Sequence, residues 1–201
     1  MKALGKGSIA SIVRIGLQIA WVVLWVLAVC LGLGALGYGV LLAMINSGAV
    51  DATILQGGDG QIRVGEDGGG TFSVTYDNPG AATWPVVVPA LLIGAVAIAG
   101  SLVIVWRLKR LFDSFSSGEP FRRENAQHLR VIWMTMIAIE IARYALMGLT
   151  GALLAVYGEG VRANYTFSVD LSTWGSILIL IVLAEVFREG ARLKEEQELT
   201  I

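Results

Sequence analysis

The 201-residue sequence has few of the residues from which most active sites are built. It contains one Cys and one His, too few for a disulfide framework or for a zinc site of Cys and His ligands. Charged residues make up only 15% of the chain, against about 25% in an average soluble protein. With 15 basic and 16 acidic residues, it lacks the basic excess of a nucleic-acid-binding protein. We therefore expect no direct nucleic acid binding.

The same scarcity argues against an enzyme. The single His, His128, has no acid placed to orient it in a Ser-His-Asp triad, and the His-Glu-x-x-His motif of zinc proteases is absent. The Gly-rich segments lack the Lys-Ser/Thr that completes a phosphate-binding loop. We expect no catalytic residues, no metal and no cofactor.

Apolar residues, by contrast, make up 55% of the chain, and the mean hydropathy is +0.69. A hydrocarbon core about 30 Å thick needs roughly 20 mostly apolar residues in a helix. Four stretches meet this length, at about residues 11–46, 85–108, 128–157 and 171–190. The sequence predicts an all-α integral membrane protein with four transmembrane helices, as two helical hairpins, in a single domain over residues 1–201.

The first apolar stretch is longer than the apolar region of a cleaved signal peptide, which has roughly 7–15 residues. We therefore expect it to remain a membrane helix, with Cys30 buried in it as an apolar residue. Small residues allow close helix packing, either within one protomer or in a homo-oligomer. Six glycines of the first and third stretches are candidates for such contacts: Gly32, Gly34, Gly37, Gly39, Gly148 and Gly151.

Lys and Arg residues gather on one side of the four spans. Three lie in or next to the N-terminal tail, six around the loop at residues 109–127, and three in the tail at residues 188–201. The other side has only Arg63 and Arg162. Because cytosolic loops are enriched in Lys and Arg, we expect both termini and the middle loop to face the cytosol.

The loop at residues 48–83, on the opposite side, is rich in glycine and has alternating runs at residues 61–64 and 71–76. The second outer loop has a similar run at residues 165–169. Alternation bounded by glycines is typical of short strands, so we predict a small extracytoplasmic antiparallel β cap from the two outer loops. Thr-Phe-Ser-Val occurs in both loops, through either an old duplication or coincidence.

The segment after the second span contains Gly118, Pro120 and Phe121 in the run Ser-Gly-Glu-Pro-Phe, followed by Asn125. Together with the closing segment at residues 183–201, this motif resembles a bacterial membrane-protein family known as domain of unknown function 2975. The resemblance implies a small integral protein of the bacterial cytoplasmic (inner) membrane. It also implies a regulatory partnership, with a small helix-turn-helix regulator as the candidate cytosolic partner.

Two ionisable residues lie in the middle of the third span. Glu140 and Arg143 are three residues apart, and Tyr144 is one turn from Glu140, so all three share one helical side. An ionisable residue inside a bilayer is a candidate functional site. The spacing favours an internal ion pair that pins the helix, and a proton or anion site is the alternative.

Further charged residues lie at the ends of the fourth span. Glu185 precedes Arg188 by one turn, and a helix-orienting salt bridge with it, or with Arg130 or Arg14, is favoured over a coupling-ion site. Asp170 is expected to cap the fourth helix, where its oxygens can accept free backbone N–H groups.

These observations favour a signalling, regulatory or partner-docking membrane protein that acts through its cytosolic loop and tail. The basic loop also suits anionic membrane lipid. The alternative is a small carrier or channel subunit that uses Glu140 and Arg143, or an accessory subunit of a larger membrane complex.

Overall fold

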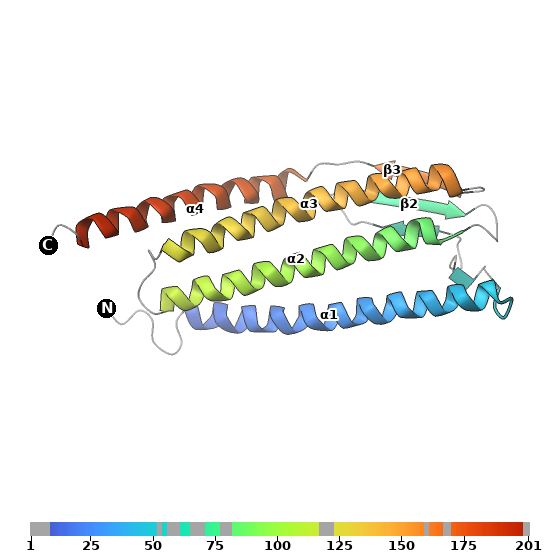
Figure 1. Ribbon diagram of the computed structural model, residues 1–201, viewed down its shortest axis with the longest axis horizontal. Helices are drawn as coiled ribbons and strands as arrows, with labels where there is room; N and C mark the ends of the chain where they lie inside the picture. Colours follow the sequence, from blue (N-terminus) through green and yellow to red (C-terminus); the bar gives the residue numbers. More distant parts are fainter. Residues whose placement is uncertain are drawn as a thin grey trace. The chain divides into compact units, whose positions relative to one another are not determined.

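The structure, a computed structural model, describes eight segments of the chain: residues 9–51, 54–55, 61–64, 71–76, 82–116, 123–158, 161–166 and 170–198. These segments contain four helices and three strands (Figure 1). In chain order they are α1 (Ile9–Asn46), β1 (Gln61–Val64), β2 (Thr71–Tyr76), α2 (Trp84–Ser116), α3 (Arg123–Tyr157), β3 (Val161–Thr166) and α4 (Leu171–Glu198).

All four helices are long and apolar enough to cross a membrane, which confirms the prediction of four such helices. Their apolar side chains are largely exposed, and none of the residues in the most apolar stretch of α1 is buried by the rest of the chain. The expectation that Cys30 is buried is therefore wrong, because its side chain is exposed on α1. Apolar faces of this kind are compatible with lipid contact.

The chain forms two compact units, and α1, α2 and α3 each contribute to both. The first unit comprises Met1–Ala28, Ala97–Glu140 and Ser172–Ile201. The second comprises Val29–Val96 and Ile141–Leu171. The first unit therefore holds nearly all of α4, and the second holds the three strands.

The core of the first unit is a cluster of buried leucine and isoleucine side chains. Leu111 of α2 packs with Leu129 and Ile132 of α3. Partly buried side chains of α2, α3 and α4 surround this cluster: Ile104, Leu108, Phe115, Met136, Leu180, Ala184 and Phe187. The rings of Phe115 and Phe187 have centroids 5.8 Å apart. The apolar side chains of residues 108–115 recur at helical spacing, and α2 continues to Ser116. These side chains pack against α3 and α4.

Two side-chain contacts attach α1 to α2 in this unit. Arg14 forms an ion pair with Asp113, and the ammonium group of Lys109 lies 5.2 Å from the ring centroid of Trp21. Both contacts involve the C-terminal part of α2, where charged residues follow the apolar run. They are surface contacts between the first part of α1 and the last part of α2.

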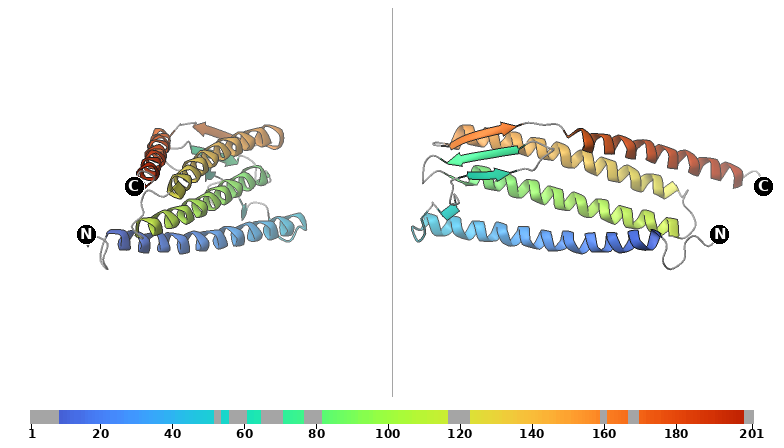
Figure 2. Two further views of the ribbon diagram at one scale, coloured as in Figure 1. Left: turned by 60° about the vertical axis from the view of Figure 1, so that its left-hand side comes forward. Right: turned by 180° about the vertical axis from the view of Figure 1, so that it is seen from behind.

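The second unit contains a three-stranded antiparallel sheet in the order β1-β2-β3, which the right-hand view of Figure 2 shows side by side. Gln61 pairs with Thr75 across β1 and β2, and Tyr76 pairs with Val161 across β2 and β3. The prediction of a small antiparallel sheet built from both loops is confirmed. The side chain of Val74 in the central strand is fully buried, so other parts of the chain cover it.

The third strand, however, begins four residues before the predicted run at residues 165–169. The chain leaves α3 through Gly158, whose N–H donates to the carbonyl of Leu154 at 2.8 Å, and Val161 then donates to the carbonyl of Gly158 at 3.2 Å. A Cβ atom at Gly158 would lie 2.3 Å from the Leu154 oxygen. This glycine turn starts β3 early, and residues 167–169 lie outside the described residues.

The described residues include the whole first copy of Thr-Phe-Ser-Val but only Thr166 of the second copy. Thr71 is the first residue of β2, whereas Thr166 is the last residue of β3, and the two pair with each other. Residues 167–169 of the second copy lie outside the described residues, so duplication and coincidence both stay predictions.

For five of the six candidate glycines the described chain supplies no close contact, and packing between protomers stays a prediction. An added Cβ at Gly32, Gly34, Gly37, Gly39 or Gly148 would meet nothing within 4 Å. At Gly100 of α2 it would lie 2.4 Å from Cδ1 and 2.6 Å from Cγ1 of Ile139 on α3. The close approach of α2 to α3 thus depends on a glycine outside the predicted set.

We predict that Gly100→Ala lowers the stability of the protein. The added methyl group must displace the β-branched Ile139, and overpacking costs about 1–3 kcal/mol, which outweighs the roughly 1 kcal/mol gained in helix propensity. Thermal unfolding in detergent, followed by circular dichroism, measures the effect. Gly148→Ala is the matched control and should be neutral or stabilising. Equal melting temperatures for the two variants would show that the close α2–α3 contact is absent.

Candidate functional site

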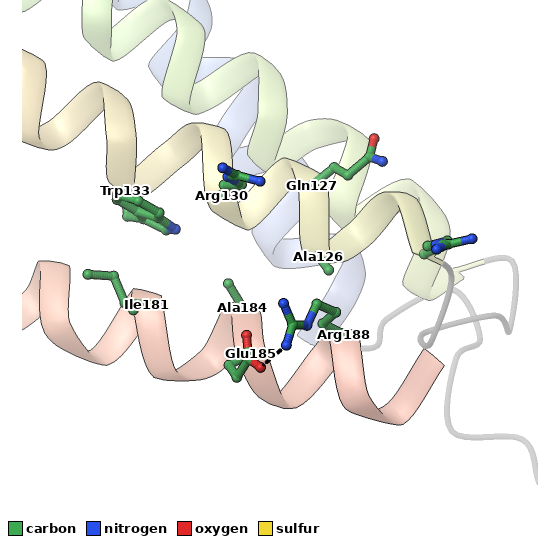
Figure 3. A pocket seen from close by; sticks show the side chains of 9 residues that line it. Ala126, Gln127, Arg130, Trp133, Ile181, Ala184, Glu185 and Arg188 are labelled. Carbon is green, nitrogen blue, oxygen red and sulfur yellow. Dashed lines mark hydrogen bonds and ion pairs between the residues drawn. The ribbon is translucent and has the colours of Figure 1, made fainter. Parts of the chain in front are cut away.

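A cavity of about 450 Å³ lies between α3 and α4 in the first unit. Side chains of α3 and α4 face this cavity, and Figure 3 shows eight of them with labels. Five of the nine lining residues belong to α3 and four to α4: Arg123, Ala126, Gln127, Arg130, Trp133, Ile181, Ala184, Glu185 and Arg188.

Helical periodicity explains why these residues share one cavity. Intervals of three, four and seven residues place side chains on one face of a helix, and such intervals separate the lining residues of both helices. Ala126 and Ala184 are small and face each other's helix across the gap (Figure 3). The short alanine side chains leave space that larger residues would fill.

The cavity is lined by three arginines and one glutamate. Glu185 forms an ion pair with Arg188 on its own helix (Figure 3). Within the described part of the chain, neither Arg123 nor Arg130 forms an ion pair. The lining therefore carries an excess of positive charge, which suits an anion.

Polar contacts between α2 and α3 hold the start of α3 beside the cavity. The amide nitrogen of Asn125 donates to the hydroxyl of Ser114 at 2.8 Å, and the Asn125 side chain is only 1% exposed. One turn further along, Nη1 of Arg107 lies 3.2 Å from Nδ1 of His128. Asn125 thus braces α3 against α2. Gly118, Pro120 and Phe121 of the same sequence motif lie outside the described residues.

Comparison with known proteins places most of this chain in one family. Residues 74–201 match the family described as "Protein of unknown function (DUF2975)". The chain belongs to this family. No curated protein and no solved structure gives a significant match.

The part that matches the DUF2975 family covers α2, α3, β3 and α4, with the last residues of β2. All nine residues that line the cavity lie within it, as do Asn125 and Ser114. Helix α1 and strand β1 lie outside it. The cavity is thus part of the DUF2975 region of the chain.

None of the residues singled out in the middle of the third predicted span lines this cavity. Glu140 is 7% exposed and belongs to the first unit. In the second unit, Nη2 of Arg143 donates to the hydroxyl of Tyr144 at 3.3 Å, and its guanidinium lies 5.0 Å from the Tyr144 ring centroid. Asp170 directly precedes the first residue of α4, which is the position of a helix cap.

The cavity itself was not predicted from the sequence. The sequence predicts a salt bridge or a coupling-ion site for Glu185, with Arg188 or Arg130 as the partner in the salt bridge, and it assigns no role to Trp133. The seven-residue spacing of Arg123 and Arg130 was the available signal, since it places both on one face of α3. Among the described residues, no three His, Cys, Asp or Glu side chains are grouped as metal ligands would be.

We predict that Asn125→Ala lowers the melting temperature of the detergent-solubilised protein. The substitution removes a buried hydrogen bond, which costs about 1–3 kcal/mol, or about 2–4 °C per kcal/mol for a chain of this size. Gln127→Ala is the control, because Gln127 is an exposed amide on the same helix.

The double variant with Ser114→Ala separates this hydrogen bond from other effects of the substitution. The two changes should be non-additive by about 0.5–1.5 kcal/mol, because each removes the same bond. Additive effects would mean that Asn125 does not brace α3 through Ser114.

Proposed function

We propose that this DUF2975 protein is a multi-pass protein of the bacterial cytoplasmic membrane whose basic end docks a cytosolic protein. The basic end comprises residues 107–116 of α2, 123–130 of α3 and 188–198 of α4. The observation that carries the proposal is the packed core at this end, formed by Leu111 and Leu129 with the Asn125–Ser114 hydrogen bond. Helix ends that serve only to connect a membrane span to a loop need no packed core.

Helix length supports the same conclusion. Helix α3 has 35 residues, or about 52 Å at 1.5 Å per residue, whereas the hydrocarbon core is about 30 Å thick. The surplus of α2, α3 and α4 includes the charged residues of the basic end. Because Lys and Arg favour the cytosolic side, we place the basic end and both termini in the cytosol.

The end of α4 has the properties of a docking helix. Arg192 bonds to Glu189 at 2.7 Å and to Glu196 at 3.4 Å, and these pairs, each one turn apart, favour the helical conformation. Leu193 between them is 50% exposed. A helix that presents an apolar side chain among fixed charges suits the surface of a partner protein, and the family resemblance favours a small helix-turn-helix regulator.

We predict that deleting residues 195–201 removes the partner without preventing membrane insertion. The deletion shortens the exposed end of α4 and leaves the apolar span and the core intact. In-membrane crosslinking in the native host, followed by purification and mass spectrometry, identifies the partner of the full chain. A variant in which residues 195–201 are scrambled is the control for length and charge. A partner that is retained by the deletion variant would contradict the proposal.

A second candidate function, a carrier or channel subunit, is favoured by the burial of Glu140. This carboxylate lies in the apolar part of α3 with 7% of its surface exposed, and ionisable groups in such positions often mark ion pathways. In this case the protein would act as an oligomer or as part of a larger complex, because four spans are few for a carrier.

The carrier function predicts that Glu140→Gln abolishes ion flux in proteoliposomes while the melting temperature changes little. The amide keeps the shape of the side chain but cannot exchange a proton or carry a charge. Proton and potassium flux through the wild-type protein are measured first with fluorescent dyes. Glu124→Gln, the same change at an exposed glutamate of α3 that does not line the cavity, is the control for the loss of a carboxylate. An absence of flux through the wild-type protein would discard this candidate.

A further inference from the structure

We infer that the cavity between α3 and α4 binds the phosphate headgroup of an anionic phospholipid from the cytosolic leaflet. The inference rests on the proposed membrane location of the chain but not on the proposed protein partner. Arg130, Arg188 and Arg123 would bind the phosphate, and Trp133 and Ile181 would contact the apolar part of the lipid.

The position of the cavity along α4 supports a lipid. From Leu171 to Ala184 the helix has no charged residue, and Arg188 is its first cation. The cavity is lined both by Ile181 in the apolar part and by Arg188, so it spans the change from apolar to charged surface. The polar headgroup and the first carbons of a phospholipid meet at such a boundary.

The arginines supply the chemistry that recognises a phosphate. A guanidinium group has five N–H donors in a planar fork, and this geometry matches two oxygens of a phosphate. Arg188 donates to Glu185 through Nη2, which leaves donors on its other nitrogens. Arg123 and Arg130 form no ion pair within the described part of the chain. The lining thus offers several donors to a single anion.

The remaining lining residues favour a lipid over a free phosphate ion. Trp133 and Ile181 face the gap between the helices (Figure 3), and tryptophan is enriched at the membrane–water interface. A volume of about 450 Å³ is within the range of roughly 300–1,000 Å³ for ligand pockets, and it exceeds what an inorganic phosphate fills. The apolar wall would therefore contact the glycerol backbone and acyl chain.

A bound lipid would act as a link between α3 and α4. Arg130 and Arg188 lie on different helices, so one phosphodiester between them would pair with both guanidinium groups, and its single negative charge would neutralise one of their two positive charges. The headgroup would also weaken the repulsion between these arginines, and the lipid content of the cytosolic leaflet would then influence how α3 and α4 pack at the basic end.

Lipid binding to the full-length, delipidated protein in a neutral detergent tests the inference. Native mass spectrometry and thermal unfolding are measured with phosphatidylglycerol, phosphatidylcholine or inorganic phosphate. We expect one tightly bound phosphatidylglycerol per chain and an increase in melting temperature that phosphatidylcholine does not give. Stabilisation by inorganic phosphate that equals that by phosphatidylglycerol would overturn the lipid assignment.

Three substitutions distinguish the cavity from general surface charge. Arg130→Gln should weaken phosphatidylglycerol binding by about tenfold, because a hydrogen-bonded charge partner is lost. Arg110→Gln removes an exposed arginine of the basic end that does not line the cavity, and it should change binding less than about twofold. Glu185→Gln should strengthen binding, because it removes the negative charge beside Arg188.

Equal weakening by Arg130→Gln and Arg110→Gln would overturn the inference, as would weaker binding to Glu185→Gln. The Glu185→Gln result remains decisive even where Arg130→Gln fails to fold. The variant lacking residues 195–201 should keep phosphatidylglycerol binding, since none of those residues lines the cavity. Deletion of residues 195–201 therefore tests the protein partner, and the substitutions in the cavity test the lipid, so that either proposal can fail without the other.

Discussion

The helices of this protein are longer than the apolar layer that they are proposed to cross, and the surplus has to be stabilised outside that layer. The shortest helix, α4, has 28 residues and the longest, α1, has 38, or about 42 Å and 57 Å at 1.5 Å per residue. Within the lipid, apolar side chains can lie on the outer surface of the helices, because the surrounding acyl chains are apolar as well. Turns that extend into water need a core of their own. Leu111 packs with Leu129 and Ile132 where the apolar runs of α2 and α3 meet their charged ends.

The same constraint explains why polar side chains are buried at the basic end. A short extension of three helices buries little apolar surface, and hydrogen bonds between helices then contribute a large part of its specificity. Asn125 is almost fully buried and donates to Ser114, which fixes the rotation of α3 against α2. Arg123 and Arg130, which line the cavity, lie within five residues of Asn125 on the same helix.

The fold could be predicted where local chemistry determines it, and not where tertiary contacts do. Apolar runs of helical length identify four helices, and glycine-bounded alternation identifies β1 and β2. The start of β3 depended on the turn at Gly158 and on its register with β2, which alternation alone does not contain. The prediction that Cys30 is buried is wrong, because none of the most apolar stretch of α1 is covered by the rest of the described chain.

For the candidate site, the sequence identified charged residues but not the space between them. The ion pair of Glu185 and Arg188 was among the predicted alternatives, since spacing of one turn is local. A cavity requires in addition that Ala126 and Ala184 lie where two helices approach each other, and this is a property of the pair of helices. Arg188 ends the cavity, and Arg192, one turn later, is bound to Glu189 and Glu196. Adjacent turns of α4 therefore differ in their surroundings: Arg188, which is paired with Glu185, also lines the cavity with Arg123 and Arg130 of α3, whereas Arg192 is bound between two glutamates of its own helix.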